Sequence, residues 1–409
     1  MSIKILDLFA GAGGFSEGFY LNNCDLVAHI EMDKEACNTL TTRAIFHALK
    51  KKNKLNFYKK YLLGEITKND IIAKFHLEKE RDSVIQAEIG KENCALLINE
   101  VRSRLAGRKL DIIIGGPPCQ AYSNIGRSRD DRGMKGDKRN FLYRYYVDFL
   151  IGLKPKVFIF ENVLGLKTAG GGKYLRDMRK LMKEAGYDTD YRILNAADYG
   201  VPQSRKRLIM IGWDKSSKIK RYPDFQKKDR SYLVKDFLKD LPSIKSNNLL
   251  KMMDYKTDSV FLKKLGIREK WLTNVFDHIT RPNTKKDLDI YKIALQKHSK
   301  GKLLKYNELP KKLVTHQNTK AFLDRFKVVD SNAKAAQTIV AHISKDGHHF
   351  IYPDKNQLRS ISVREAARLQ TFPDSYKFEG SRTAQFHQIG NAVPPMLADQ
   401  IASVILKEI

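Results

Sequence analysis

Residues 110–123 read LDIIIGGPPCQAYS, an apolar run followed by a turn. The isoleucines at 112–114 predict a strand that is buried on both faces, as in a parallel sheet covered by helices. Two glycines and two prolines then end the strand, and Cys119 follows on the turn. Because open α/β sheets bind ligands beyond the carboxyl ends of their strands, Cys119 is a candidate nucleophile rather than a packing residue.

A strand followed by glycines opens the chain. Residues 3–9 are apolar and predict a buried strand, and the segment AGAGGFSEGF then supplies glycines that let a ligand approach the backbone. Residues 25–33 predict a second strand that ends in acid, about 20 residues beyond the glycines, where a carboxylate can bind ribose hydroxyls. The spacing GxGG differs from the dinucleotide fingerprint GxGxxG, so a nucleotide-like cofactor is indicated without its identity.

Strands and helices continue to alternate along the next part of the chain. Strands are predicted at 83–89 and 156–160 and as a pair at 187–200 and 207–212, with helices between them. This alternation is typical of an α/β fold with a mainly parallel sheet. A lysine-rich stretch at about 41–80 predicts a helical insertion, and we favour a solvated face over DNA contact for its charges.

Acids stand at the ends of three predicted strands, as Glu31, Glu88 and Glu161. Since the carboxyl ends of parallel strands share one edge of the sheet, we expect these carboxylates around one site. Glu31 suits ribose hydroxyls, with Met32 beside it to pack on an adenine face. Glu88 suits an adenine amino group. Glu65 stands in a similar GEI triplet and competes for that role, and we favour Glu88 because a strand precedes it.

The charge balance points to a polyanionic partner. The 409 residues carry a formal net charge of +29 with a pI near 9.7, and such an excess of Lys and Arg attracts nucleic-acid phosphates. The four cysteines have no CxxC spacing and the histidines no ligand partners, so we expect no metal. No signal peptide and no membrane-spanning run is recognised, and we expect a cytoplasmic protein without a membrane partner.

The character of the sequence changes after residue 213. Residues 1–213 are predicted to form the catalytic and cofactor-binding domain. Residues 214–355 are lysine-rich with short apolar clusters and predict a smaller second domain with a basic balance that suits DNA. Residues 356–409 are predicted to return to the first domain.

Two local structures are expected near the end of the chain. Residues 337–350 predict a β-hairpin with its turn at 345–347. Residues 362–371 predict a helix, in which Ser362 and Glu365 have the spacing of a capping box.

Seven motifs in order resemble those of the DNA (cytosine-5)-methyltransferases. They read DLFAGAGGF, EMD, GGPPCQAYS, ENV, QSRKR, REAARLQTFPD and QIGNAVPP. Each motif is weak alone, but seven in this order are specific. The resemblance implies a Rossmann-like sheet of the S-adenosylmethionine-dependent methyltransferase type with a smaller target-recognition domain. It also implies S-adenosylmethionine as cofactor and double-stranded DNA in the cleft between the domains.

The resemblance also implies roles for four catalytic residues. Carbon 5 of cytosine is a poor nucleophile, and a Cys119 thiolate that adds to carbon 6 activates it. Glu161 matches the acid that protonates or hydrogen-bonds ring nitrogen 3. Arg205 matches the arginine that holds the cytosine carbonyl oxygen, with Arg207 in support. The cytosine must first be flipped out of the duplex.

Binding residues follow from the same resemblance. The cofactor set consists of Phe9, Gly11, Gly13, Glu31, Met32, Glu88, Gly116, Pro118, Leu142, Asn391 and Val393. The DNA set consists of Gln120, Ser123, Arg127 and Thr338.

Other functions fit the residues less well. Exocyclic-amine methyltransferases place an aromatic residue where Cys119 stands, and a dehydrogenase would need a different glycine pattern. A DNA-binding module without activity would not need Cys119, Glu161 and Arg205 together. A tRNA-methylating relative stays open, although the basic second domain favours DNA. We expect a monomer acting on the prokaryotic nucleoid in a restriction–modification system, with any cognate restriction endonuclease acting separately.

Overall fold

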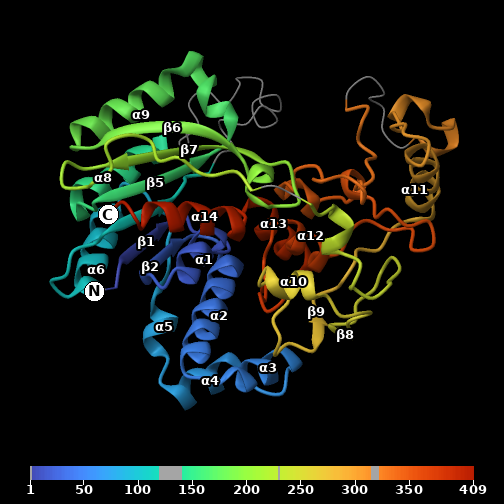
Figure 1. Cartoon of the computed structure of the whole chain (residues 1–409), viewed down its shortest axis with the longest axis horizontal. Helices are drawn as coiled ribbons and strands as arrows, with labels where there is room; N and C mark the ends of the chain where they lie inside the picture. Colours follow the sequence, from blue (N-terminus) through green and yellow to red (C-terminus); the bar gives the residue numbers. More distant parts are fainter. Residues whose placement is uncertain (1, 119–140, 229–230, 315–321) are drawn as a thin grey trace.

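A seven-stranded sheet forms the centre of the molecule (Figure 1). The computed structural model describes residues 2–118, 141–228, 231–314 and 322–409. The strand order is β3-β2-β1-β4-β5-β7-β6, in which β1 to β5 run parallel and β7 is antiparallel to both of its neighbours. The predicted α/β fold is confirmed. The strands are β1 (Lys4–Leu8), β2 (Asp25–Glu31), β3 (Val84–Gln86), β4 (Ile112–Gly115), β5 (Val157–Asn162), β6 (Asp188–Asn195) and β7 (Lys206–Trp213).

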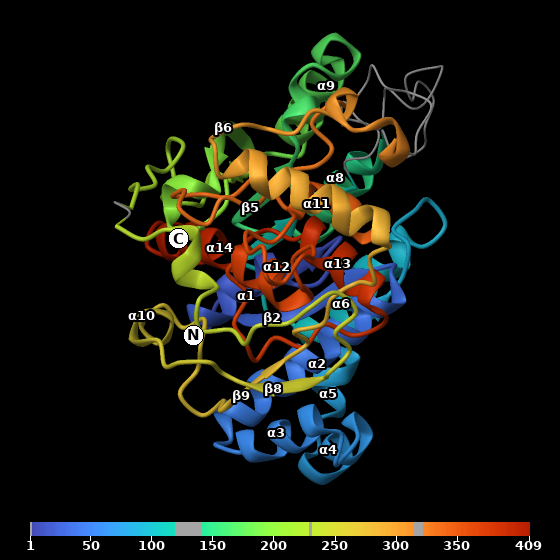
Figure 2. The ribbon, with the colours of Figure 1, turned by 90° about the vertical axis from the view of Figure 1, so that its right-hand side faces the viewer.

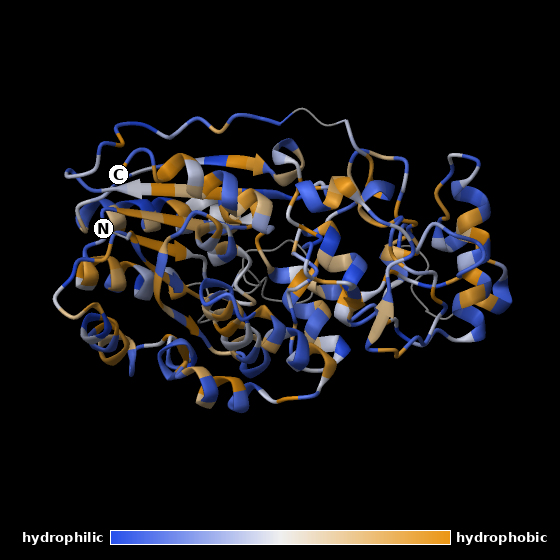
Figure 3. Cartoon of the chain, turned by 60° about the horizontal axis from the view of Figure 1, so that its bottom comes forward, coloured by the Kyte–Doolittle hydropathy of each residue, from blue (hydrophilic) through white to orange (hydrophobic). Residues whose placement is uncertain are grey.

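Helices cover both faces of the sheet because its central strands are apolar on both sides. In β4, Ile113 belongs to the core under α6, α8 and α9, whereas Ile112 and Ile114 belong to the core under α1 and α14. Figure 3 shows the strands as hydrophobic bands between helices of mixed polarity. These helices are α1 (Gly14–Leu21), α6 (Cys94–Leu105), α8 (Leu142–Leu153), α9 (Lys173–Glu184) and α14 (Pro395–Ile405).

The predicted helical insertion packs together with α2 as a separate layer of helices. Asp33 starts α2 by accepting a hydrogen bond from the Ala36 amide at 2.8 Å, which satisfies one of the free amides of the first turn. The layer has its own small core around Phe46 and Tyr58. Its helices are α2 (Lys34–Lys51), α3 (Leu55–Leu63), α4 (Lys68–Phe75) and α5 (Glu78–Asp82).

The remainder of the chain contains little regular sheet. Its described strands, β8 and β9, form a two-stranded ribbon, and α11 lies at the right-hand edge of the molecule in Figure 1 and faces the viewer in Figure 2. The elements are β8 (Met252–Asp254), α10 (Val260–Lys264), β9 (Asn274–Phe276), α11 (Lys285–His298), α12 (Val363–Leu369) and α13 (Arg382–Asn391). Within the described residues, no helix has the length and apolar composition to cross a membrane.

The predicted hairpin at 337–350 is wrong. Two short 3₁₀ helices, Ala341–Ser344 and His348–Phe350, occupy this segment. The chain enters this segment from Ala336, which pairs with Gln203 in a distant loop, and the segment's own backbone bonds are the short-range ones of the 3₁₀ helices, such as that from the Ile343 amide to the Val340 carbonyl. The predicted capping box on α12 is confirmed, since Ser362 accepts from the Glu365 amide and Glu365 accepts from the Ser362 amide.

Two hydrophobic clusters include residues from both sides of positions 213 and 355. Ile219 and Tyr222 lie beyond residue 213, yet they pack onto the sheet with Trp213. Helices α12 and α13 lie beyond residue 355, yet they share a core with Val234 and Phe237. We therefore refer to residues 231–392 as the second domain, and only α14 returns to the sheet.

Candidate active site

The loop between β1 and α1 has a backbone conformation that glycine favours. Gly11 and Gly13 have φ angles of 54° and 77°, and Gly13 is the N-cap of α1. Phe9 also has a positive φ of 55°. A Cβ atom added to Gly11 would meet no atom within 4 Å, so the space beside this glycine is open. The loop therefore offers an open backbone surface next to a helix N-terminus.

Glu31 fastens this loop to the end of β2. Its Oε2 accepts from the Gly11 amide at 2.8 Å, and its Oε1 accepts from the amides of Met32 and Asp33 at 2.9 and 2.8 Å. Burial raises the pKa of Glu31, although these amide hydrogen bonds oppose the shift. The Met32 side chain is 56% exposed beside it. The loop, the carboxylate and an accessible methionine thus meet at one strand end.

The two candidates for the third acid lie in different parts of the fold. Glu88 follows β3 by two residues and is exposed. Since Gln86 at the end of β3 pairs in register with Glu31, Glu88 follows the same edge of the sheet. Glu65 lies in the turn between α3 and α4, in the helical layer. Glu88 stays the better prediction.

The turn after β4 is pressed between two neighbouring strands. A Cβ atom on Gly115 would lie 1.9 Å from the carbonyl oxygen of Leu8, and one on Gly116 would lie 1.9 Å from the carbonyl oxygen of Glu161. A side chain at either position would displace a strand, so glycine is required. The turn thus lies directly against the end of β5.

Several of the predicted site residues lie at the end of this turn or after it. Pro118 is half-buried and is the last described residue before the gap. Cys119, Gln120, Ser123 and Arg127 lie outside the described residues. The Asn162 side chain donates to the Pro117 carbonyl at 3.3 Å, which ties the described part of the turn to the end of β5.

Glu161 and Arg207 form an ion pair across β5 and β7. The Arg207 Nε lies 2.9 Å from Glu161 Oε1, and the two side chains are 15% and 17% exposed. Both residues belong to adjacent antiparallel strands, which fixes their separation. The pair is shielded from bulk water yet accessible from the site, so the carboxylate and the guanidinium can act together on a ligand.

Arg205 occupies a different environment from the one expected. Its side chain is 1% exposed, and its guanidinium donates to the carbonyl oxygens of Ile339 and Gly390 at 2.8 and 3.1 Å and of Asn391 at 3.3 Å. A guanidinium committed to three carbonyls is not placed to hold a base. Of the two arginines, Arg207 is the one beside Glu161, at 2.9 Å.

The loop that holds Arg205 also holds the segment of Thr338. The Thr338 hydroxyl donates to the Ser204 carbonyl, and the Ser204 amide donates to the Ala336 carbonyl at 2.8 Å. The Gln203 side chain accepts from the Ile339 amide at 2.7 Å. Sequence reasoning missed Gln203 as a positioning residue, although the QSRKR motif contains it.

The remaining cofactor candidates lie at the end of α13, in the link from α13 to α14 and at the start of α8. Val393 follows α13, and a Cβ atom on Gly14 would lie 2.2 Å from its carbonyl oxygen, so this segment contacts the glycine loop. Asn391 ends α13, is exposed and bonds to His387 at 3.3 Å. Leu142 begins α8 and is half-buried. Segments from both ends of the chain thus border one site.

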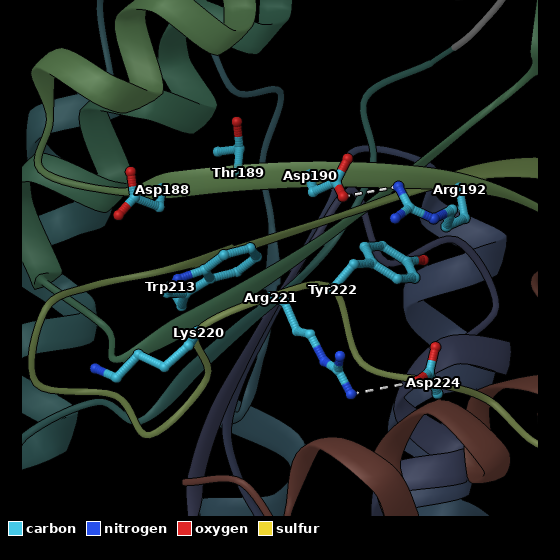
Figure 4. A pocket seen from close by; sticks show the side chains of 9 residues that line it. All are labelled: Asp188, Thr189, Asp190, Arg192, Trp213, Lys220, Arg221, Tyr222 and Asp224. Carbon is cyan, nitrogen blue, oxygen red and sulfur yellow. Dashed lines mark hydrogen bonds and ion pairs between the residues drawn. The ribbon is translucent and has the colours of Figure 1, made fainter.

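A surface pocket beside β6 does not belong to this site. It lies between β6 and residues 220–224, and charged side chains line it (Figure 4). Arg192 lies 2.7 Å from Asp190 and Arg221 lies 3.8 Å from Asp224, so both arginines have acidic partners at the surface. In the part of the chain that the structure describes, no three His, Cys, Asp or Glu side chains gather as metal ligands.

Known proteins resemble this chain over its full length. The model of the C-5 cytosine-specific DNA methylase family matches residues 3–74 and 65–407. The Type II methyltransferase M.Bpa9945I of Bacillus paralicheniformis is 39% identical over 438 residues, which cover 98% of each chain. The Type II methyltransferase M.XorII of Xanthomonas oryzae is 33% identical over 416 residues, covering 98% of this chain and 84% of the relative.

Solved structures agree with this assignment. A putative DNA modification methyltransferase encoded within an E. coli prophage has a TM-score of 0.66 at 25% identity, covering 100% of this chain and 99% of that one. The Entamoeba histolytica methyltransferase EhMeth has a TM-score of 0.56 at 15% identity, covering 100% and 98%, and shares the fold. The chain belongs to the C-5 cytosine-specific DNA methylase family and is a DNA (cytosine-5)-methyltransferase.

Proposed function

We propose that this enzyme transfers the methyl group of S-adenosylmethionine to carbon 5 of a flipped-out cytosine in double-stranded DNA, with Cys119 as nucleophile. The contact of Gly116 with the backbone of Glu161 carries this proposal. It brings the turn that ends at Pro118 against the strand that carries Glu161. We infer that the next residue in the sequence, Cys119, acts with the Glu161–Arg207 pair on one base. That combination suits nucleophilic addition to a heterocycle.

Each of these side chains has a distinct task in the reaction. The Cys119 thiolate adds to carbon 6 of the cytosine, while Glu161 hydrogen-bonds or protonates ring nitrogen 3. Arg207, held by Glu161 at 2.9 Å, donates to the cytosine carbonyl oxygen. Carbon 5 then takes the methyl group, a base removes the proton from carbon 5, and the bond between Cys119 and carbon 6 breaks. Arg205 positions the surrounding segments.

The glycine loop fits S-adenosylmethionine, which supplies an electrophilic methyl group when bound. The open space beside Gly11 admits a ligand against the backbone, and the exposed Met32 can cover an adenine face. Glu31 already accepts three amide hydrogen bonds, and its remaining lone pairs suit ribose hydroxyls. The other proposed cofactor contacts are Phe9, Gly13, Glu88, Gly116, Pro118, Leu142, Asn391 and Val393.

The DNA contacts and the biological setting are also proposals. The proposed DNA-contacting residues are Thr338 in the second domain and Gln120, Ser123 and Arg127 in the segment that follows the turn after β4. The net charge of +29 supports binding to a polyanion. Since two relatives are named Type II methyltransferases, we propose that the enzyme is the modification component of a restriction–modification system. It would act as a monomer on nucleoid DNA in the cytoplasm, and any cognate endonuclease would act separately.

Replacement of the nucleophile gives the first test. The Cys119→Ala protein should bind DNA but transfer no tritiated methyl group from S-adenosylmethionine to a plasmid from a methylation-deficient host. Bisulfite sequencing of the same plasmid after treatment with the wild-type enzyme identifies the modified cytosine and its sequence context. Transfer by Cys119→Ala to that cytosine would remove Cys119 as nucleophile.

A mechanism-based probe gives the second test. A duplex with 5-fluorocytosine at the mapped position should trap a covalent complex, because fluorine blocks proton removal from carbon 5. The complex should require both S-adenosylmethionine and Cys119. Methylation of the normal duplex without any trapped complex would refute the covalent step.

The two arginines of QSRKR form a matched pair of variants. Arg207→Ala should lower the single-turnover rate about 10²- to 10³-fold without changing the melting temperature, because it removes a donor from the reacting base. Arg205→Ala should lower the melting temperature, since three buried carbonyl oxygens lose their donor. The opposite pattern would restore the original assignment of Arg205 to the base.

A further inference from the structure

The helical insertion contacts the second domain through aromatic side chains. Trp271 lies three residues before β9, and its ring centroid is 6.3 Å from that of Tyr58 on α3 and 6.2 Å from that of Phe46 on α2. Lys59 on α3 also donates to the Thr273 hydroxyl at 3.0 Å. Figures 1 and 2 both show α3 next to β9. The segment that leads into β9 therefore packs against the insertion.

Polar contacts join the same layer to the stretch after α12. The fully buried Tyr58 donates from its hydroxyl to the Ser375 carbonyl at 3.0 Å. Glu379 accepts from the hydroxyls of Thr42 and Tyr61, and Lys68 on α4 lies 3.7 Å from the same carboxylate. The insertion therefore touches the second domain at two places that are about 100 residues apart in the sequence, around 271 and around 377.

The same contacts continue to the glycine loop. Arg43 on α2 donates to the Ser375 hydroxyl at 3.1 Å and to Glu17 on α1 at 2.8 Å. Next to Ser375, the Tyr376 hydroxyl donates to the Ala12 carbonyl inside the loop. Arg43 also stacks over the Tyr376 ring at 4.7 Å. A continuous set of buried contacts therefore runs from α3 through Ser375 to the proposed cofactor loop.

We propose that α3 and α4 form a brace that fixes the orientation of the second domain relative to the cofactor end of the sheet. Trp271, Tyr58 and Glu379 are its positioning residues. The brace holds the second domain on the side of β9, whereas the contacts of Thr338 and Gln203 with their partners hold it beside β7. Duplex DNA must fit the orientation that the two sets of contacts together impose. This inference rests on the proposed function, because it assumes that DNA binds between the sheet and the second domain.

The test compares two aromatic truncations in the full-length enzyme. Trp271→Ala removes the ring between the insertion and the second domain. Phe57→Ala is the matched control, since Phe57 on α3 packs against Phe75 on α4, 4.8 Å between centroids, inside the insertion. The measurements are kcat and KM with a duplex that carries the mapped site, the rate on a duplex with one mismatched base pair, and the Kd for S-adenosylmethionine.

The brace predicts a change in DNA recognition rather than in cofactor binding. Trp271→Ala should raise KM for the duplex about tenfold and lower discrimination against the mismatch about tenfold, because a small misplacement of the second domain weakens productive binding. Its Kd for S-adenosylmethionine should stay within about twofold, and Phe57→Ala should leave KM and discrimination unchanged. A lower melting temperature with wild-type KM and discrimination would overturn the proposal, and so would equal effects of both truncations.

Two further variants keep the test decisive if Trp271→Ala does not fold. Tyr58→Phe keeps the ring and removes only the hydrogen bond to Ser375, and it should shift KM and discrimination in the same direction by about threefold. Trp271→Phe should restore most of the discrimination. Unchanged values in Tyr58→Phe would overturn the brace. Absence of methylation by the wild-type enzyme would instead refute the proposed function.

Discussion

The sheet and the second domain pair their buried backbone polar groups in different ways. In the sheet, β4 and β5 bury Ile113 and Phe158 completely, and the backbone polar groups are paired in the strand ladders. In the described part of the second domain, the strands are the three-residue pair β8 and β9. Its interior instead contains the fully buried arginines Arg359, Arg364 and Arg368.

These arginines satisfy carbonyl groups that no ladder reaches. Arg364 donates to the carbonyl oxygens of Phe276, at the end of β9, and of Pro373 and Tyr376 in the irregular segment after α12. Arg368 donates to the carbonyl oxygen of Phe237. Buried carbonyls must find donors, and a guanidinium has five N–H groups in a fixed plane. The comparison shows that an irregular core is ordered here by charged side chains.

The charge of each buried arginine is balanced by carboxylates. Arg368 bonds to Asp240 and Asp374, and all three side chains are fully buried. Burial by itself raises the pKa of Asp374, but the Arg368 guanidinium outweighs burial and holds the pKa below its ordinary value. Arg359 and Glu365 form the same kind of pair. Removal of one partner would leave a buried charge without compensation.

The largest expected effect breaks such a pair. Arg368→Met keeps most of the side-chain volume but removes the buried cation between Asp240 and Asp374. Asp240 then keeps Arg268 as a partner, and Asp374 keeps the Tyr255 hydroxyl. The substitution should lower the free energy of unfolding by about 3–5 kcal/mol. Ile113→Val in β4 should cost about 0.5–1.5 kcal/mol, because it removes one buried methyl group. Urea denaturation measures both values. If Arg368→Met costs no more than Ile113→Val, the arginines do not order the second domain.

The next largest expected effect is a dependence of the unfolding free energy on pH that arises in the second domain. His278 in the second domain is buried, which lowers its pKa to about 4. The unfolded chain, with an ordinary histidine pKa of 6.5, binds the proton first, so stability should fall as the pH decreases from 6.5. Between pH 6.5 and 5 this residue alone should cost about 2 kcal/mol.

The variant His278→Gln provides the measurement. The neutral imidazole donates from Nε2 to the Pro242 carbonyl at 3.0 Å and accepts from the Ser362 hydroxyl at Nδ1 at 2.7 Å. Glutamine does not titrate, so the slope of unfolding free energy against pH should be shallower in His278→Gln than in the wild type. Identical slopes would mean that His278 does not contribute to acid sensitivity.

The same contrast explains which parts of the fold could be predicted from the sequence. Apolar runs predicted the strands of the sheet, and the acid at the end of β2 was predicted at the glycine loop, where Glu31 bonds to Gly11. Apolar runs carry this information because a strand that is buried on both faces is apolar along its length, whichever segment it pairs with. The hairpin at 337–350 was wrong, since its partner is a loop that contains Gln203, more than 130 residues away.

The arginines of QSRKR show most clearly what could not be predicted from the sequence. Motif spacing identified both Arg205 and Arg207, but it did not show which one is buried against carbonyls. Arg207 lies on β7, where pairing with β5 brings it to Glu161, whereas Arg205 precedes the strand and turns inward. That difference depends on tertiary contacts with residues after 336, which no local pattern contains.

The smallest expected effect compares two helix caps. Asp33 caps α2 next to the sheet with one hydrogen bond to the Ala36 amide, and Asp33→Ala should cost about 1 kcal/mol. Ser362 caps α12 in the second domain, accepting from the Glu365 amide at 3.1 Å while its hydroxyl serves His278. Ser362→Ala should cost about 2 kcal/mol, because a buried imidazole nitrogen also loses its partner.

The double variant of Ser362→Ala and His278→Gln should cost less than the sum of the single variants, whereas Asp33→Ala and His278→Gln should be additive. Equal cap costs with additive behaviour at both sites would contradict the view that caps in the second domain belong to a buried polar network.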